Sequence, residues 1–125
     1  MINPLSIPSF LTGVVFVIAG VVMLKRPPKE INSLYGYRTP NSMKDQESWN
    51  YAQAYSAKEM IRLGIFLTLV SSMGIWYKPG IGVSAILTFA LLTCTILLLF
   101  IRVERAINRN RKMKKRLTGK VDNEF

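Results

Sequence analysis

Residues 79–101 read PGIGVSAILTFALLTCTILLLFI and contain no charged side chain. A helix needs about 20 apolar residues to cross the hydrocarbon core of a bilayer, so this run predicts a transmembrane helix over about 80–102. Residues 1–24 are also free of charged side chains and predict an earlier span over about 5–24. A secretory signal peptide is disfavoured for that run, because it lacks a positive n-region and a small-residue cleavage site.

A third uncharged run, residues 63–77, is shorter than the other two. Its flanking residues Arg62 and Lys78 have long aliphatic stems, which let their charges reach the head groups while the chain crosses the membrane. We therefore predict a second span over about 60–77. The predicted fold class is an all-α integral membrane protein with three transmembrane helices in one domain, residues 1–125.

Composition supports this class and excludes several kinds of site. Half of the residues are hydrophobic, yet the formal net charge is +10, a combination that fits a chain whose charges lie between long apolar runs. With one cysteine and no histidine, a zinc site or a Cys/His nucleophile is excluded within one chain. We expect no catalytic residue, no metal ligand and no cofactor, and hence no enzyme.

The basic residues predict the orientation. Of the 17 Lys and Arg residues, only Lys78 lies outside residues 25–62 and 102–120. Positive residues stay cytoplasmic, so we predict an external N-terminus, a cytoplasmic loop and helix over 25–59, and a basic cytoplasmic tail over 103–125. Membrane lipids are the expected partners of this tail. Nucleic-acid binding would use the same charge, but topology already accounts for it, and we expect none.

The segment before the second span has the features of a helix. Residues 42–45, SMKD, fit the capping pattern [ST]-x-x-[DE] and predict a helix start, and residues 46–58 contain no Gly or Pro. Trp49 and the residues three, four and seven positions after it share one helical face. We predict an interfacial helix between the first and second spans, with Trp49, Tyr51 and Tyr55 in the inner aromatic belt. Its continuation into the second span is left open.

The candidate site lies in the cytoplasmic loop, because the cores of the predicted spans carry no ionisable groups for ion transport or proton relay. Arg38 can present a bidentate fork to a phosphate or carboxylate. Gly36 lets the backbone turn or approach a ligand closely. The alternative is that Arg38 pairs with Asp45 or Glu47 and ties the loop to the following helix.

Residues 31–40 read INSLYGYRTP and are followed by Ser42-Met43 and by Trp49-x-x-Ala52. This pattern, Asn-x-x-x-Gly-x-Arg-Thr-Pro after a first span with a Trp and a helix hairpin to follow, resembles the SdpI family over about residues 10–105. That family comprises bacterial membrane proteins that include immunity factors against a secreted killing toxin. The resemblance implies a non-enzymatic, multi-pass protein of the bacterial inner membrane.

Three functions stay open at this point. The first is immunity, with a peptide or protein toxin or a regulatory protein as partner. The second is a binder, transporter or modifier of a lipid or small amphiphile, in which Arg38 and Asn32 hold an anionic head group. The third is a subunit of a larger membrane complex, and a homo-oligomer is compatible with each. The candidate binding or motif residues are Asn32, Tyr35, Gly36, Arg38, Thr39, Pro40, Ser42, Asp45, Glu47, Trp49 and Gln53.

Overall fold

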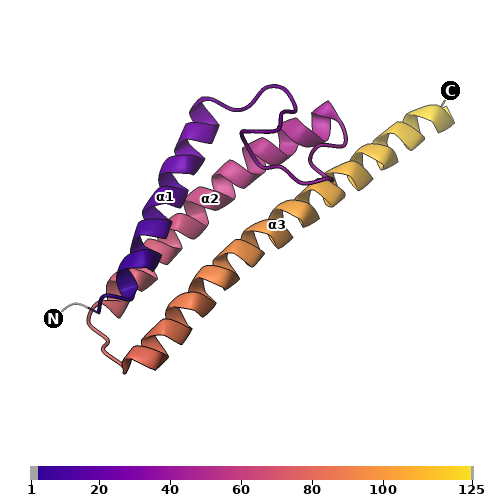
Figure 1. Cartoon of the computed structure of the whole chain (residues 1–125). Helices are drawn as coiled ribbons and strands as arrows, with labels where there is room; N and C mark the ends of the chain where they lie inside the picture. Colours follow the sequence, from indigo (N-terminus) through magenta and orange to yellow (C-terminus); the bar gives the residue numbers. More distant parts are fainter. Residues whose placement is uncertain (1–2, 125) are drawn as a thin grey trace.

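The computed structural model describes residues 3–124, which form three helices and no strand. The helices are α1 (Ser6–Lys25), α2 (Gln46–Gly74) and α3 (Ile81–Glu124). α1 packs along α2, and α3 runs beside α2 and far beyond it (Figure 1). The predicted all-helical class is confirmed. Residues 1, 2 and 125, which the predicted domain includes, lie outside the described part of the chain.

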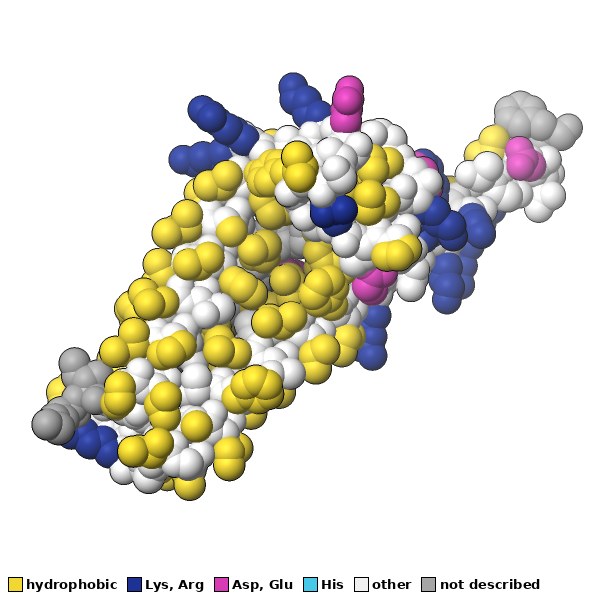
Figure 2. All heavy atoms as spheres, in the orientation of Figure 1, with side chains coloured by type: hydrophobic (Ala, Val, Ile, Leu, Met, Phe, Trp, Pro, Cys, Tyr) yellow, Lys and Arg dark blue, Asp and Glu magenta, His cyan; other side chains and the backbone are white. Residues whose placement is uncertain are grey.

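Two of the helices, α1 and α3, are long and apolar enough to cross a membrane. The 20 residues of α1 correspond to about 30 Å, the thickness of a hydrocarbon core. Only 22% of the apolar window of α1 and 17% of that of α3 are buried inside the protein. Hydrophobic side chains accordingly cover the face of the bundle seen in Figure 2. Apolar surface of this extent favours contact with lipid.

α2 combines a polar first half with an apolar second half in one unbroken helix. The predicted interfacial helix and the predicted second span are therefore parts of the same element. The predicted cap at Ser42 is wrong, because the N-cap is Asp45, whose carboxylate accepts a hydrogen bond from Ser48 N at 2.7 Å. Ser42 is instead buried in the preceding turn, where its hydroxyl accepts a hydrogen bond from Thr39 N at 2.8 Å.

α3 continues through the predicted tail. Its 44 residues span about 66 Å, roughly twice the hydrocarbon thickness. Helix continues past Arg102 because residues 103–118 contain no Gly or Pro and are rich in Arg and Lys, which favour helix. Val103, Ala106 and Ile107 are buried, so the first turns of this basic half belong to the core of the protein.

The backbones of α1 and α2 are in direct contact. A Cβ added at Gly64 would lie 2.6 Å from the Gly13 carbonyl oxygen, and one added at Gly20 would lie 2.6 Å from the Ala57 carbonyl oxygen. Small residues permit this approach in membrane helices, where close packing drives association. The glycines therefore determine how near α1 lies to α2.

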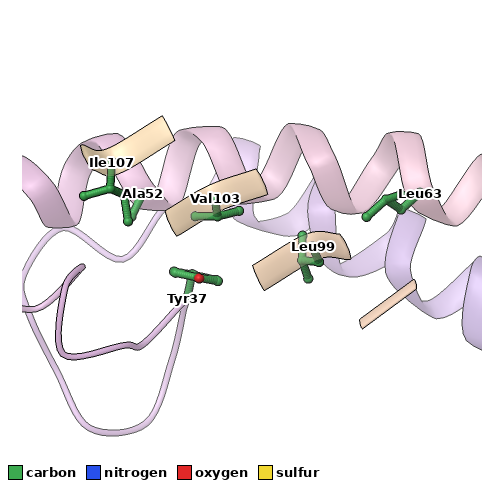
Figure 3. Packing of buried hydrophobic residues seen from close by; sticks show 6 residues of the cluster. All are labelled: Tyr37, Ala52, Leu63, Leu99, Val103 and Ile107. Carbon is green, nitrogen blue, oxygen red and sulfur yellow. The ribbon is translucent and has the colours of Figure 1, made fainter. Parts of the chain in front are cut away.

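The main hydrophobic cluster joins the α1–α2 loop to α2 and α3 (Figure 3). The Tyr37 ring also lies 5.5 Å, centroid to centroid, from the Phe100 ring. Since Tyr37 comes from the loop, this segment folds as part of the core. The buried members are Tyr37, Ala52, Leu63, Leu99, Val103 and Ile107.

We predict that Gly64→Ala lowers the stability of the protein by about 1–3 kcal/mol, because the new methyl group must push α1 away. The matched control is Gly82→Ala on α3, where an added Cβ meets nothing within 4 Å. That control should be neutral or slightly stabilising, as Ala favours helix over Gly. Thermal unfolding of both variants in detergent measures the difference. Equal midpoints would contradict the close α1–α2 contact.

Candidate functional site

Two side chains of α2 hold the α1–α2 loop. The Trp49 indole N–H donates to the Pro28 carbonyl oxygen at 2.8 Å, and the Trp49 side chain is fully buried. Gln53 Oε1 accepts from Tyr37 N at 2.7 Å, while Gln53 Nε2 donates to the Tyr37 carbonyl at 2.7 Å. The expectation that Trp49 lies in an aromatic belt is therefore wrong. Its N–H satisfies a loop carbonyl that has no helical partner.

The same contact between the loop and α2 requires glycine at position 36. Its φ of +105° lies in the region that L side chains rarely adopt. An added Cβ would also lie 2.5 Å from Gln53 Oε1 and 2.8 Å from Pro28 Cγ. Gly36 thus permits the close approach of the loop to α2.

α3 holds the loop from the other side through Glu104. Its Oε1 accepts from the Tyr37 hydroxyl at 2.8 Å and the Thr39 hydroxyl at 2.7 Å, and its Oε2 accepts from Asn41 Nδ2 at 2.9 Å. Burial raises the pKa of Glu104, but these hydrogen bonds and the charge of Arg111 outweigh burial and lower it. Burial and the neighbouring Glu104 raise the pKa of Tyr37 well above its usual range. Tyr37 therefore stays a neutral donor and Glu104 a charged acceptor at neutral pH.

Further along α3, basic residues reach back to the loop and to the start of α2. Arg111 donates to Ser48 Oγ at 3.0 Å from Nε and 2.9 Å from a terminal nitrogen, and it also bonds the side chain and backbone oxygens of Asn41. Lys114 pairs with Glu47. The part of the tail nearest the bundle is thus attached to it.

Glu59 links α2 to α3 through two arginines. Its side chain is almost fully buried, and it pairs with Arg62 at 2.9 Å and Arg102 at 3.0 Å. The two arginine side chains stay largely exposed, whereas the Glu59 side chain is only 2% exposed. Such a buried charge is tolerated only because it is paired, so we expect both arginines to be needed.

Several predicted site residues give the loop its shape. Asn32 Oδ1 accepts from Leu34 N at 2.9 Å and Tyr35 N at 2.7 Å, which forms an Asx turn. The Tyr35 hydroxyl donates to the Arg26 carbonyl oxygen at 3.0 Å. Asn32 is therefore engaged locally, and it is not among the residues that line a groove which Arg38 shares with residues of all three helices. Pro40 is an exposed residue of the turn that follows.

Arg38 differs from Tyr37 and Thr39 on either side of it, because its side chain is exposed and has no hydrogen bond or ion pair within residues 3–124. The alternative partners are engaged elsewhere, since Asp45 caps α2 and Glu47 pairs with Lys114. The hydrogen bond from the Ser48 backbone N–H is the main cause that lowers the pKa of Asp45, and the positive charges of Arg111 and Lys114 lower it further.

Arg38 stands at the rim of a groove of about 520 Å³. Figure 2 shows a hollow lined largely by hydrophobic side chains between α1 and α3, below the loop. An apolar groove with one guanidinium at its rim is suited to an anionic group on an apolar body. The lining residues are Ala19, Val22, Met23, Leu34, Tyr35, Gly36, Tyr37, Arg38, Met60 and Phe100.

The two acidic residues that organise this end of the bundle, Glu59 and Glu104, were missed from the sequence. Each had a signal, since Glu59 is an acidic residue directly before the predicted second span and Glu104 lies between Arg102 and Arg105. An acidic group at the edge of a membrane span is unfavourable unless it has partners. Arg111 was assigned only to the basic tail.

We predict that Glu104→Gln lowers the stability of the protein by about 2 kcal/mol at neutral pH, because three hydrogen bonds lose their charged acceptor. Since the folded pKa is depressed, this contribution is full above the unfolded pKa of about 4.3 and is lost as pH falls through the folded pKa. The difference from the natural protein should shrink over that range in thermal unfolding. Glu124→Gln, at an exposed position of α3, is the control. An unchanged midpoint for Glu104→Gln at neutral pH would contradict the role of Glu104 in holding the loop.

Comparison with known proteins identifies the family. A model of the SdpI/YfhL protein family matches residues 29–103, which cover most of the loop, all of α2 and the apolar half of α3. The uncharacterized protein YfhL of Bacillus subtilis (strain 168) is 38% identical over 95 residues, covering 76% of this chain and 81% of YfhL. No solved structure matches. The resemblance of the loop signature is confirmed, and the chain belongs to the SdpI/YfhL protein family.

Proposed function

We propose that this chain is a non-enzymatic, multi-pass protein of the bacterial inner membrane that protects the cell against a secreted, membrane-active toxin. Membership of the SdpI/YfhL family supports the proposal, since the family signature is the one associated above with immunity factors. The apolar outer surfaces of α1 and α3 support the membrane location. The observation that carries a binding role is Arg38, exposed and without an ion pair within residues 3–124, at the rim of the groove.

The proposed topology has three spans, with the apolar second half of α2 as the middle one. The N-terminus and the α2–α3 turn then face outward, while the loop, Arg38 and the basic half of α3 are cytoplasmic. Lys and Arg gather at the loop end and along the far part of α3 in Figure 2. Their distribution supports this orientation, because positive segments resist translocation.

A toxin that acts in the membrane has an apolar body, and the groove offers such a body apolar walls. Arg38 can add a bidentate contact to a carboxylate or phosphate of the bound molecule. The loop is held from both α2 and α3, so Arg38 meets its ligand on a framework that needs little rearrangement. Such preorganisation lowers the cost of binding.

A second candidate function rests on the same groove. An anionic lipid or small amphiphile of the inner leaflet has the same chemistry, an anionic group on an apolar chain. In that case the protein binds, transports or modifies this molecule, and toxin resistance is not its role. The chain could instead serve as a subunit of a larger membrane complex or contact a regulatory protein. In that case, binding of neither the toxin nor the amphiphile should depend on Arg38.

We predict that Arg38→Lys lowers protection in a toxin-sensitive strain at least about tenfold in survival, because Lys keeps the charge but lacks the planar fork. The thermal midpoint should stay unchanged, since Arg38 is exposed and unpaired among the described residues. Arg109→Lys, at an exposed position of α3, is the matched control and should retain protection.

Native mass spectrometry of the purified protein separates the two candidate ligands. The amphiphile function would be favoured if the natural protein retains phosphatidylglycerol and Arg38→Lys loses it, while neither protein protects the cell against the toxin. Full protection by Arg38→Lys at normal protein levels would contradict a role for this residue in immunity.

The topology has its own test, in single-cysteine variants of a Cys94→Ala background treated with a membrane-impermeant thiol reagent on intact cells. A cysteine in place of Lys78 should be labelled from outside. Cysteines in place of Lys44 and Asn123 should react only after the cells are opened. External labelling at position 123 would reverse the proposed orientation and move the Arg38 groove to the outside.

A further inference from the structure

The N-terminal end of α1 and the α2–α3 turn lie at the opposite end of the bundle from the α1–α2 loop (Figure 1). Residues at that end line a second cavity. Its volume is about 250 Å³, and all three helices contribute to its lining. Among residues 3–124, no charged side chain lines it. Its polar lining includes hydroxyl groups from each helix, namely Ser6, Ser9, Ser71, Ser84 and Thr88.

Three of these hydroxyl groups have protein partners. Ser6 Oγ donates to the Asn3 carbonyl oxygen at 2.7 Å, and Thr88 Oγ1 donates to the Leu5 carbonyl oxygen at 2.8 Å. Ser84 Oγ accepts from Asn3 Nδ2 at 3.2 Å. The bonds of Thr88 and Ser84 tie the start of the described chain to α3. Their role is structural.

The other two, Ser9 on α1 and Ser71 on α2, are 2% and 3% exposed. Their Oγ atoms are buried and have no hydrogen-bond partner within residues 3–124. Other helical hydroxyls here donate to the carbonyl four residues earlier, as Thr68 and Ser72 do at 2.8 Å. A buried hydroxyl that is left unsatisfied destabilises the fold, because it has lost its bonds to water without replacement. Ser9 and Ser71 both line this cavity and both carry an unsatisfied hydroxyl, which points to a ligand that satisfies both.

We propose that this cavity binds an uncharged group that carries a hydroxyl or amide on a small apolar body. An ion is unsuitable, because no charged residue of the described chain lines the cavity to compensate its desolvation. A hydroxyl or amide both donates and accepts, which matches two serine hydroxyls on facing helices. Val70, Leu87 and Leu91 supply apolar walls for the body. The volume suits a small molecule, since pockets for drug-sized ligands begin at about 300 Å³.

The test uses two probes of nearly equal size, para-fluorobenzyl alcohol and para-fluorotoluene, with the full chain in detergent. Fluorine NMR titration measures their affinities against protein-free micelles. The natural protein should bind the alcohol more tightly than the toluene. The double variant Ser9→Ala/Ser71→Ala should bind the alcohol about tenfold more weakly, the effect of roughly two ordinary hydrogen bonds. Its affinity for the toluene should not change.

Ser72→Ala is the matched control, because this neighbouring serine already bonds Thr68 and does not line the cavity. It should bind both probes as the natural protein does. Arg38→Lys should also leave alcohol binding unchanged, since Arg38 lines the groove at the other end. The outcome of this test is therefore independent of whether the proposed function is correct.

A thermal unfolding measurement without probe separates a ligand site from a structural role. Removing two unsatisfied buried hydroxyls, which turns each hydroxymethyl side chain into a methyl group, should leave the midpoint of the double variant unchanged or raise it. A clearly lower midpoint would show that the two hydroxyls bond within the protein and would overturn the proposal. Equal alcohol affinity in the natural protein and the double variant, or a natural protein that binds the toluene as tightly as the alcohol, would overturn it too.

Discussion

Tyr37 is held from two sides, and the cytoplasmic end of the proposed topology is built around this residue. The Gln53 amide pairs with both backbone polar groups of Tyr37, while Glu104 accepts a hydrogen bond from its phenol. The ring completes the hydrophobic cluster between α2 and α3. A loop without helix or strand thereby becomes a fixed layer between two helices, because its buried polar groups find partners. The exposed position of Arg38, next in the chain, follows from this arrangement.

Two acidic residues, the buried Glu59 and the partly buried Glu104, organise a chain that carries a formal net charge of +10. Glu59 brings Arg62 and Arg102 together where the apolar parts of α2 and α3 end. Glu104, which follows Arg102 closely on α3, instead accepts hydrogen bonds from the loop, within residues 37–41. Each carboxylate satisfies several donors at once, which offsets the cost of removing it from water. Glu59 thus offsets the repulsion between arginines of α2 and α3, which would otherwise push the two helices apart.

The two ends of the bundle have different chemistry. The loop end presents a cation beside an apolar groove of about 520 Å³, whereas the other end has a smaller cavity, lined by two unsatisfied hydroxyls and by no charged side chain of the described residues. Between them, glycines bring the backbones of α1 and α2 into contact. Close packing in the middle separates the two proposed binding regions. In the proposed topology, these regions lie toward opposite faces of the membrane.

The sequence by itself determined the apolar parts of α1 and α3 and the likeness to the family, and it predicts a candidate site in the loop. Uncharged runs predict α1 and α3 because their composition alone decides whether a helix suits lipid. The loop signature around Gly36 and Arg38 indicates the SdpI/YfhL family. The sequence also predicted a helical face that includes Trp49 and Gln53, and both are buried.

Only the tertiary structure decided which residues of the signature are free to bind and which hold the loop. Asn32, Asp45 and Glu47 are all engaged by protein partners, whereas Arg38 has none among the described residues. The anchor Glu104 lies 67 residues from Tyr37 in the chain. Helical periodicity reports only neighbours within a few residues, so it cannot reveal a hydrogen bond across such a separation. Chain folding brings these donors and acceptors together, and only their pairing shows that the signature residue Arg38 lacks a partner within residues 3–124.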